Sequence, residues 1–231
     1  QRHFDRVSFD LIYARPGHTA EAWERELDRA LGFGTGHLSL YQLTIEPGTR
    51  FETMARKGDF VPLDPDDGAT LYELTREMTE AAGIPAYEIS NHARAGQQSR
   101  HNLTYWRYGD YVGIGPGAHG RRSGNATIRH KKPENWIDAI ARNGHGLHSE
   151  DMLSPEDRAR EALLMGLRLA EGVDLARIAL HSGLSPDTLI DAGAVARMTD
   201  LGLLIHTGTH VTITPQGMLL LDAILAEIVE V

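Results

Sequence analysis

The sequence predicts an α/β protein whose C-terminal part is mostly helical and resembles a winged helix. A β-rich run at residues 7–13 is followed by a helical pattern at 19–32 and a second β-rich run at 37–45. This order is typical of two parallel strands joined by a crossover helix. Helical patterns then surround one short hairpin near the C-terminus. With 41% hydrophobic and 24% charged residues, a chain of 231 residues can bury a substantial core.

Capping and turn residues set the limits of the N-terminal elements. The first strand ends at Arg15-Pro16-Gly17, and Thr19 is a suitable N-cap for the helix that follows. A second helix is predicted to start at Asp64-Pro65 and to end at Gly83. Residues 86–90 are predicted as a third strand. The apolar positions expected to face the core from the two helices are Trp23, Leu27, Ala30, Leu31, Leu71, Leu74 and Met78.

The charge distribution divides the chain into two predicted domains, residues 1–145 and 146–231. Residues 150–231 carry 5 basic and 13 acidic side chains, whereas residues 1–149 carry 18 and 19. The boundary is placed near Gly144 to Leu153. After it we expect helices at 154–172, 175–181 and 185–202, a hairpin at 203–207 and 210–213, and a last helix from 214. Helices followed by a hairpin wing and another helix indicate a winged-helix-like module.

Composition excludes several classes of function. A net charge of −9 argues against a basic nucleic-acid binder. The absence of cysteine excludes disulfides, thiolate zinc sites and a cysteine-ligated iron–sulfur cluster held by this chain alone. No apolar run approaches the roughly 18 residues of a membrane span, and no signal-peptide pattern opens the sequence. A cytoplasmic protein that is not embedded in a membrane is expected.

The segment from residue 91 to about 132 has no clean periodicity and is rich in glycine, arginine, histidine and aromatic residues. Three of the seven tyrosines and one of the three tryptophans lie within residues 105–111. A flat apolar ligand with charged edges requires aromatic faces, arginines and an imidazole of this kind. The alternative is a loop whose aromatics fill the open end of a sheet, with Arg100 and Arg107 solvated. The glycines of residues 113–117 lack the helix start of a phosphate loop, and indicate close backbone approach instead.

A set of motifs, in a fixed order, resembles the radical SAM heme chaperones (HemW-like), relatives of oxygen-independent coproporphyrinogen III oxidase (HemN-like). The resemblance runs over essentially the whole chain, and the His-Asn-x-x-Tyr-Trp block favours the chaperone branch. The motifs are Phe9-Asp10-Leu11-Ile12-Tyr13 with Pro16-Gly17, residues 38–49 (Leu-Ser-Leu-Tyr-Gln-Leu-Thr-Ile-Glu-Pro-Gly-Thr), Tyr87-Glu88-Ile89-Ser90-Asn91, His101-Asn102-x-x-Tyr105-Trp106, Gly109-Asp110-Tyr111-x-Gly113-Ile114-Gly115 and Ala118-His119.

This resemblance implies the C-terminal half of a partial (β/α) TIM-like radical SAM barrel, followed by a C-terminal domain of the HemN type. It implies a protein that binds heme and delivers it to apoproteins, with the oxidase as the alternative activity. The family uses S-adenosylmethionine and a [4Fe–4S] cluster. The family's Cys-x-x-x-Cys-x-x-Cys motif is absent here, so this chain alone is expected to be catalytically inactive, and no catalytic residue is assigned.

The resemblance also implies binding residues. Asp10 matches the strand-end aspartate that contacts S-adenosylmethionine. His101 and His119 are candidate heme ligands, on a surface that also contains Asn102, Tyr105 and Trp106. In the oxidase relatives a second S-adenosylmethionine lies near the positions of Leu103, Thr104 and His119, but the residue types differ. This sequence departs from the family pattern at two places. Ala14-Arg15 stands where the family has Gly-Leu, which would narrow the barrel mouth beside the cofactor, and Pro116 stands where the family usually has a small residue. The alternative for His101 and Asn102 is that they only hold a loop in place.

Other interpretations rest on weaker patterns. The histidine pairs His145/His148 and His206/His210 lack a third zinc ligand at a typical spacing. The predicted recognition helix at 186–201 carries three aspartates against Arg197, which would repel DNA. A basic cluster at residues 121–132 would face heme propionates, an acidic partner or solvent. A half barrel exposes a sheet edge near Leu11 and Ile12, which predicts self-association or partial disorder near residues 1–20.

Overall fold

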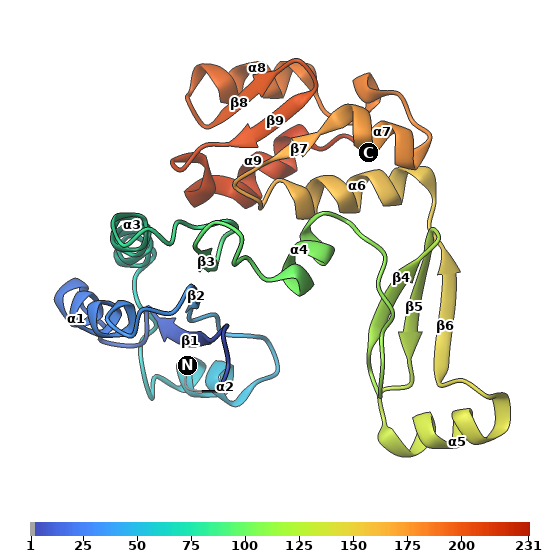
Figure 1. Ribbon diagram of the computed structural model, residues 1–231, viewed down its shortest axis with the longest axis horizontal. Helices are drawn as coiled ribbons and strands as arrows, with labels where there is room; N and C mark the ends of the chain where they lie inside the picture. Colours follow the sequence, from blue (N-terminus) through green and yellow to red (C-terminus); the bar gives the residue numbers. More distant parts are fainter. Residues whose placement is uncertain (1–2) are drawn as a thin grey trace. The chain divides into compact units, whose positions relative to one another are not determined.

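The computed structural model describes residues 3–231, so Gln1 and Arg2, which belong to the predicted disordered start, lie outside the described residues. The chain forms two compact units that divide between Gln98 and Ser99. The predicted domain border at 145/146 lies within the second of these units, just before a strand that pairs with residues 125–129. Both units are shown in Figure 1.

The first unit is a three-stranded sheet covered by helices. Strand β1 pairs in parallel with β2, and β3 joins β2 in the antiparallel direction. The helices α1 and α3 pack together, and their buried side chains form one core with the sheet. Its elements are β1 (Ser8–Tyr13), α1 (Ala20–Leu31), β2 (His37–Gln42), α2 (Arg50–Lys57), α3 (Pro65–Ala81) and β3 (Asn91–Ala93).

The predicted strand–helix–strand unit is confirmed, and its core has the predicted apolar members. Thr19 caps α1 by accepting a hydrogen bond from the Ala22 amide. Trp23 and Leu27 are fully buried, and the Trp23 indole donates to Thr75 Oγ1 of α3 at 2.8 Å. This buried hydrogen bond fixes the separation of α1 and α3 as well as their contact.

Two predictions in this unit are wrong. The predicted strand at 86–90 is a bend, and the strand starts only at Asn91. Two local hydrogen bonds hold the bend: the Ser90 amide donates to the Glu88 carboxylate, and the Tyr87 amide donates to the Asn91 carbonyl. Helix α2 was not predicted, because it buries no side chain and so leaves no apolar period. A capping box forms it instead: the Glu52 amide donates to Thr49 Oγ1, and the Glu52 carboxylate accepts from the Gly48 amide.

The second unit contains two further sheets. The first has the antiparallel order β4-β5-β6, with α5 connecting β5 to β6, and the second has the order β7-β9-β8. The elements are α4 (Arg100–Trp106), β4 (His119–Arg122), β5 (Asn125–Arg129), α5 (Pro133–Asn143), β6 (Leu147–Met152), α6 (Pro155–Gly166), β7 (Val173–Asp174), α7 (Leu175–Ser182), η1 (Pro186–Thr188), α8 (Ala192–Asp200), β8 (Leu204–Thr207), β9 (His210–Ile213), η2 (Gly217–Leu220) and α9 (Leu221–Ile228).

The helical module with its hairpin wing follows the prediction, with shorter helices. The β8–β9 hairpin is confirmed, and β7 adds a third strand to it. The predicted helix at 185–202 is divided into η1 and α8, because Asp191 starts a new helix by accepting a hydrogen bond from the Ala194 amide. The segment at 91–132 holds β3, α4, β4 and β5, where no periodic pattern was visible. These elements are too short to establish a period.

Burial of His92 makes the stability of the first unit depend on pH. His92 is 1% exposed on β3, and burial is the main reason that its pKa falls from 6.5 to about 3. Below about pH 6.5 the His92 imidazole is therefore protonated in the unfolded chain but neutral in the folded chain. The free energy of unfolding falls as the pH drops below this value, by up to about 1.4 kcal/mol per pH unit for one proton.

We expect urea titrations between about pH 7 and about pH 5 to show this loss in the parent chain and a smaller loss in His92→Leu. Replacing the exposed His206 with glutamine should leave the pH dependence unchanged. Equal pH dependence in His92→Leu and in the parent chain would contradict the assignment.

Candidate functional site

The open face of the sheet in the first unit is polar where the three strands lie in register. Asp10 pairs with Ser39, and Ser39 pairs with Asn91. Successive side chains of a strand point to opposite faces, so Tyr13 faces the helices and Asp10 the other side, where it is exposed. Asp10, which the resemblance placed at a strand end, lies within β1 (Ser8–Tyr13), one residue pair away from a buried polar cluster.

That cluster consists of Ser39, Asn91 and Glu88. The Ser39 hydroxyl donates to Asn91 Oδ1 at 2.8 Å, and the Asn91 amide donates to the Glu88 carboxylate. All three are buried, and burial raises the pKa of Glu88. The hydrogen bonds from Asn91 and from backbone amides oppose that rise. Residues of two separate sequence motifs are therefore joined in a single hydrogen-bonded cluster.

A second polar contact on the same sheet involves His37. Its Nδ1 lies 2.8 Å from the Ser8 hydroxyl and its Nε2 lies 3.0 Å from the Tyr87 hydroxyl. Burial is the largest cause that lowers the pKa of His37, and the positive charge of Arg6 adds to it, while Asp10 opposes it. The Asp10 carboxylate is therefore within electrostatic reach of a half-buried imidazole.

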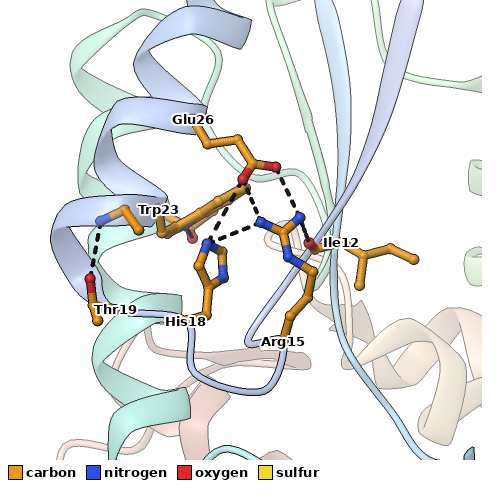
Figure 2. A network of polar contacts seen from close by, with 8 residues as sticks. Ile12, Arg15, His18, Thr19, Trp23 and Glu26 are labelled. Carbon is orange, nitrogen blue, oxygen red and sulfur yellow. Dashed lines mark hydrogen bonds and ion pairs between the residues drawn. The ribbon is translucent and has the colours of Figure 1, made fainter.

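The connection after β1 is stabilised by an arginine that the sequence marked as a departure (Figure 2). Ala14 adopts a left-handed φ of 54° and is buried, which turns Arg15 toward α1. The Arg15 guanidinium donates to the Ile12 carbonyl at 2.9 Å and to both Glu26 carboxylate oxygens, and His18 Nε2 lies 3.2 Å away. The positive charge of Arg15 is therefore paired with Glu26 and links the end of β1 to α1.

In the second unit, helix α4 carries most of the predicted ligand surface. Ser99 caps the helix by accepting a hydrogen bond from the Asn102 amide. His101 and Tyr105 lie one turn apart, with the Tyr105 hydroxyl 2.9 Å from His101 Nε2. His101 Nδ1 lies 3.3 Å from Asn102 Oδ1. Both ring nitrogens of an exposed imidazole are therefore oriented by neighbouring side chains.

Tyr111 connects this group to the region of His119. The rings of Tyr105 and Tyr111 meet edge to face at 4.4 Å, and Tyr111 and His119 line one cavity of about 310 Å³. The strand of His119 is held close to the preceding loop, because a Cβ on Gly113 would lie 2.2 Å from the His119 carbonyl oxygen. The predicted close backbone approach is confirmed at Gly113. His101, Tyr105 and His119 thus belong to one continuous aromatic region.

Trp106 lies at the other side of α4 and lines a larger cavity of about 430 Å³. The next residue, Arg107, is about half exposed and is not simply solvated, because it forms two hydrogen bonds with the Glu171 carboxylate at 2.6 and 2.7 Å. This pair raises the pKa of Arg107 and lowers that of Glu171. The structure therefore divides the predicted surface into a histidine and tyrosine part and a tryptophan part.

The basic cluster at 121–132 is not a solvated loop throughout. Arg121 is 5% exposed, and its guanidinium carbon lies 3.4 Å from the centre of the Tyr108 ring. The guanidinium also donates to the Gly109 carbonyl and lies 3.5 Å from Glu161. Sequence reasoning missed two further arginines of this region, Arg158 and Arg177, which line the 430 Å³ cavity. The signal was weak: they are two of only five basic residues in an acidic segment.

Comparisons with known proteins agree with this architecture. The HemN C-terminal domain family matches residues 153–220. The heme chaperone HemW of Bacillus subtilis is 36% identical over 217 residues, which cover 94% of this chain and 57% of that protein. The chain belongs to the HemW-like radical SAM family. Mouse radical S-adenosyl methionine domain-containing protein 1, mitochondrial, is 40% identical over 176 residues, covering 73% of this chain and 40% of that protein.

The HemW-like chain also shares its fold with a solved structure, the coproporphyrinogen III oxidase HemN from Escherichia coli, a radical SAM enzyme. The TM-score is 0.74 at 18% identity, over 96% of this chain and 54% of the oxidase. This likeness shows the predicted fold, a partial radical SAM barrel with a HemN-type C-terminal module. The matched part of the HemW-like chain covers between 40% and 57% of the length of these relatives. Among residues 3–231, no helix is long and apolar enough to cross a membrane.

The donor set of the HemW-like chain does not fit the iron–sulfur cluster of the family. The sequence has no cysteine thiolate, and within the described residues no three histidine or acidic side chains come together as metal ligands. S-adenosylmethionine is a different case, since the exposed Asp10 carboxylate suits its ammonium group or ribose hydroxyls. The cavities of the second unit contain neither thiolates nor such a ligand set.

We expect this chain alone to produce no 5′-deoxyadenosine from S-adenosylmethionine after reconstitution with iron, sulfide and a reductant. The reason is that no thiolate is present to hold the cluster that delivers the electron. Product analysis by chromatography and mass spectrometry checks this, with a full-length relative treated identically as the positive control. Nucleoside formed above the protein-free background would contradict the expectation.

Proposed function

We propose that this chain is the heme-binding C-terminal portion of a heme chaperone, which binds heme on the α4 surface and passes it to heme-accepting apoproteins. The observation that carries the proposal is the oriented imidazole of His101. The names of the relatives support it, since HemW of Bacillus subtilis is a heme chaperone. Coproporphyrinogen oxidase activity is the alternative, for which the 18% identical neighbour supports only the fold.

The contacts of His101 match those of a ligand imidazole. When Asn102 Oδ1 accepts a hydrogen bond from Nδ1–H, the lone pair of the ring is placed on Nε2. The Tyr105 hydroxyl then donates to Nε2 at 2.9 Å. Iron can replace that hydroxyl without any change of tautomer. A hydrogen bond to the other ring nitrogen is the usual way in which proteins orient a metal-binding histidine.

The other members of the surface have separate roles in this proposal. His119 is a second exposed imidazole, and it lines the 310 Å³ cavity together with Tyr111. Tyr105 and Trp106 offer aromatic faces for a flat tetrapyrrole. Asp10, in the first unit, is assigned to S-adenosylmethionine, the cofactor that the family binds together with its [4Fe–4S] cluster. We propose a cytoplasmic location. We also propose that the chain has no nucleic-acid partner, because η1 and α8 carry acidic residues at the position of a recognition helix.

Hemin titration tests the heme site. The parent chain should shift the Soret band, and His101→Ala, His119→Ala and Trp106→Ala should each weaken binding, the histidines through iron ligation and the indole through stacking. Loss of Arg107 should weaken binding by a smaller factor, and more so at low salt. His206→Ala is the matched control, an exposed histidine on the β8 strand.

Two results decide between the heme site and the nucleic-acid-binding alternative. If the His101→Ala/His119→Ala double variant keeps the spectrum and affinity of the parent chain, the heme site is not on α4. If the parent chain leaves the Soret band of hemin unshifted but binds duplex DNA, and Arg197→Gln abolishes that binding, a nucleic-acid module is the better description. Arg197 is exposed on α8, which makes it the residue to test there.

The open sheet edge predicts self-association of this chain. Strand β1 is at the edge of its sheet, and on the face away from the helices Ile12 is 48% exposed and Tyr41 is 41% exposed. Exposed apolar edges promote pairing. Sedimentation velocity should show a concentration-dependent dimer or larger species that Ile12→Lys weakens, whereas Val61→Lys, at an exposed loop position, should not. A monomer at all concentrations would contradict this prediction.

A further inference from the structure

The 430 Å³ cavity of the second unit lies outside the part of α4 that carries His101. It is lined by residues 106–110 at the end of α4, by Arg121 of β4 and the turn that follows it, by α6 and residues 169–173 after it, and by α7. Its volume is within the range of small-molecule sites. Apolar side chains form part of its wall, among them Leu169, Val173 and Ile178. The cavity is therefore large enough for an organic molecule and apolar enough to favour one.

The charged side chains that line this cavity are predominantly positive. Four are arginines, and the single acidic one, Asp110, uses its carboxylate to accept a hydrogen bond from the Ser123 amide. The arginines are Arg107, Arg121, Arg158 and Arg177. Arg158 and Arg177 come from residues 150–231, in which 13 acidic side chains outnumber 5 basic ones. A positive cavity in an acidic module selects an anion.

Carboxylates of the protein neutralise only two of these four arginines. Arg107 is paired with Glu171, and Arg121 lies 3.5 Å from Glu161. Arg158 donates to the carbonyls of His181 and Ser182 at the end of α7 and has no ion pair with a carboxylate among the described residues. Arg177 is exposed and has no ion pair there either, although its charge acts on the Glu171 carboxylate that Arg107 already binds. These two guanidinium groups can therefore bind an anion without breaking an ion pair.

Two of the arginines also leave a buried donor without an acceptor. The Nε–H of Arg121 and the Nε–H of Arg158 are buried and form no hydrogen bond. Buried polar groups are nearly always satisfied, and an exception at a cavity wall indicates a missing water or ligand. Because a guanidinium offers its donors as a planar fork, it can bind both oxygens of a carboxylate, a common group of organic anions.

The backbone that positions Arg121 is strained. Tyr108 has a left-handed φ of 56°, unfavourable for a residue with a side chain, and its ring lies against the Arg121 guanidinium. Its hydroxyl donates to Glu161 at 2.7 Å, which holds the ring in place. Strain of this kind persists where a functional arrangement requires it. The protein thus maintains a buried guanidinium at the cavity wall at a cost in backbone energy.

We infer that this cavity binds a carboxylate-bearing organic anion, with Arg158 and Arg177 as its main charge partners and Arg121 at the wall. Two sources of the carboxylate are considered. One is the propionate edge of a tetrapyrrole held on α4, since Trp106 belongs both to the predicted heme surface and to the cavity. This source rests on the proposed function. The other is a small free polycarboxylate, which is independent of it.

The experiment combines ligand and protein changes. Soret titrations compare hemin with hemin dimethyl ester, which has the same ring and iron but no free carboxylate. In the propionate case, Arg177→Gln weakens hemin binding about fivefold or more and leaves ester binding unchanged. Arg197→Gln removes the same charge from an exposed site on α8 and serves as the control. Arg158→Gln, checked for folding by circular dichroism, should repeat the effect.

A calorimetric titration with citrate forms the second arm. Binding of citrate that Arg177→Gln weakens and Arg197→Gln does not, together with hemin binding insensitive to both, assigns the cavity to a small polycarboxylate. Equal affinities of parent, Arg177→Gln and Arg197→Gln for hemin and for citrate overturn the inference. A Soret shift that depends on His101 but not on Arg177, without citrate binding, overturns it while the proposed heme site stands. Citrate binding that depends on Arg177, without any Soret shift, supports the cavity inference and contradicts the proposed heme site.

Discussion

The arrangement of the second unit depends on the burial of one charge, that of Arg121. A buried guanidinium is costly unless its charge is matched by partners. Here two segments match the charge: residues 108–109 after α4, with the Tyr108 ring at 3.4 Å and the Gly109 carbonyl, and α6, with Glu161. The Nε–H of Arg121 has no acceptor among the described residues. Since Arg121 itself is on β4, this single side chain fixes the positions of α4, β4 and α6 together. The aromatic surface and the cavity are both consequences of that arrangement.

Helix α4 presents different chemistry on its two sides. His101 and Tyr105, one turn apart, form a hydrogen-bonded pair that continues to Tyr111. Trp106 and the following Arg107 belong instead to the cavity that α6 and α7 complete. A ligand with an apolar ring, a metal and acidic edges would need both sides. A short helix supplies them because neighbouring residues point about 100° apart around its axis.

The first unit shows a different principle, in which polar groups are fixed by one another inside a small sheet. Ser39, Asn91 and Glu88 satisfy each other in the protein interior, which allows buried oxygens and nitrogens at a place where an apolar core would otherwise form. Asp10 is beside them and exposed. Asp10, Ser39 and Asn91, which come from three of the motifs that carry the family resemblance, thus lie in register on neighbouring strands of this sheet.

The sequence by itself determined the elements that have a strong local signal. Thr19, Asp64 and the Gly208 turn mark boundaries by chemistry that acts over a few residues, and the 3.6-residue period of Trp23 and Leu27 identifies a buried helix face. The order of motifs also indicated the family, and it predicts His101 and His119 as heme ligands. Only the tertiary structure decided that residues 86–90 bend, because Ser39 of β2 holds Asn91, which in turn donates to Glu88. It alone brought Arg121, Arg158 and Arg177 to one cavity from three elements, since charges far apart in sequence become neighbours only through packing.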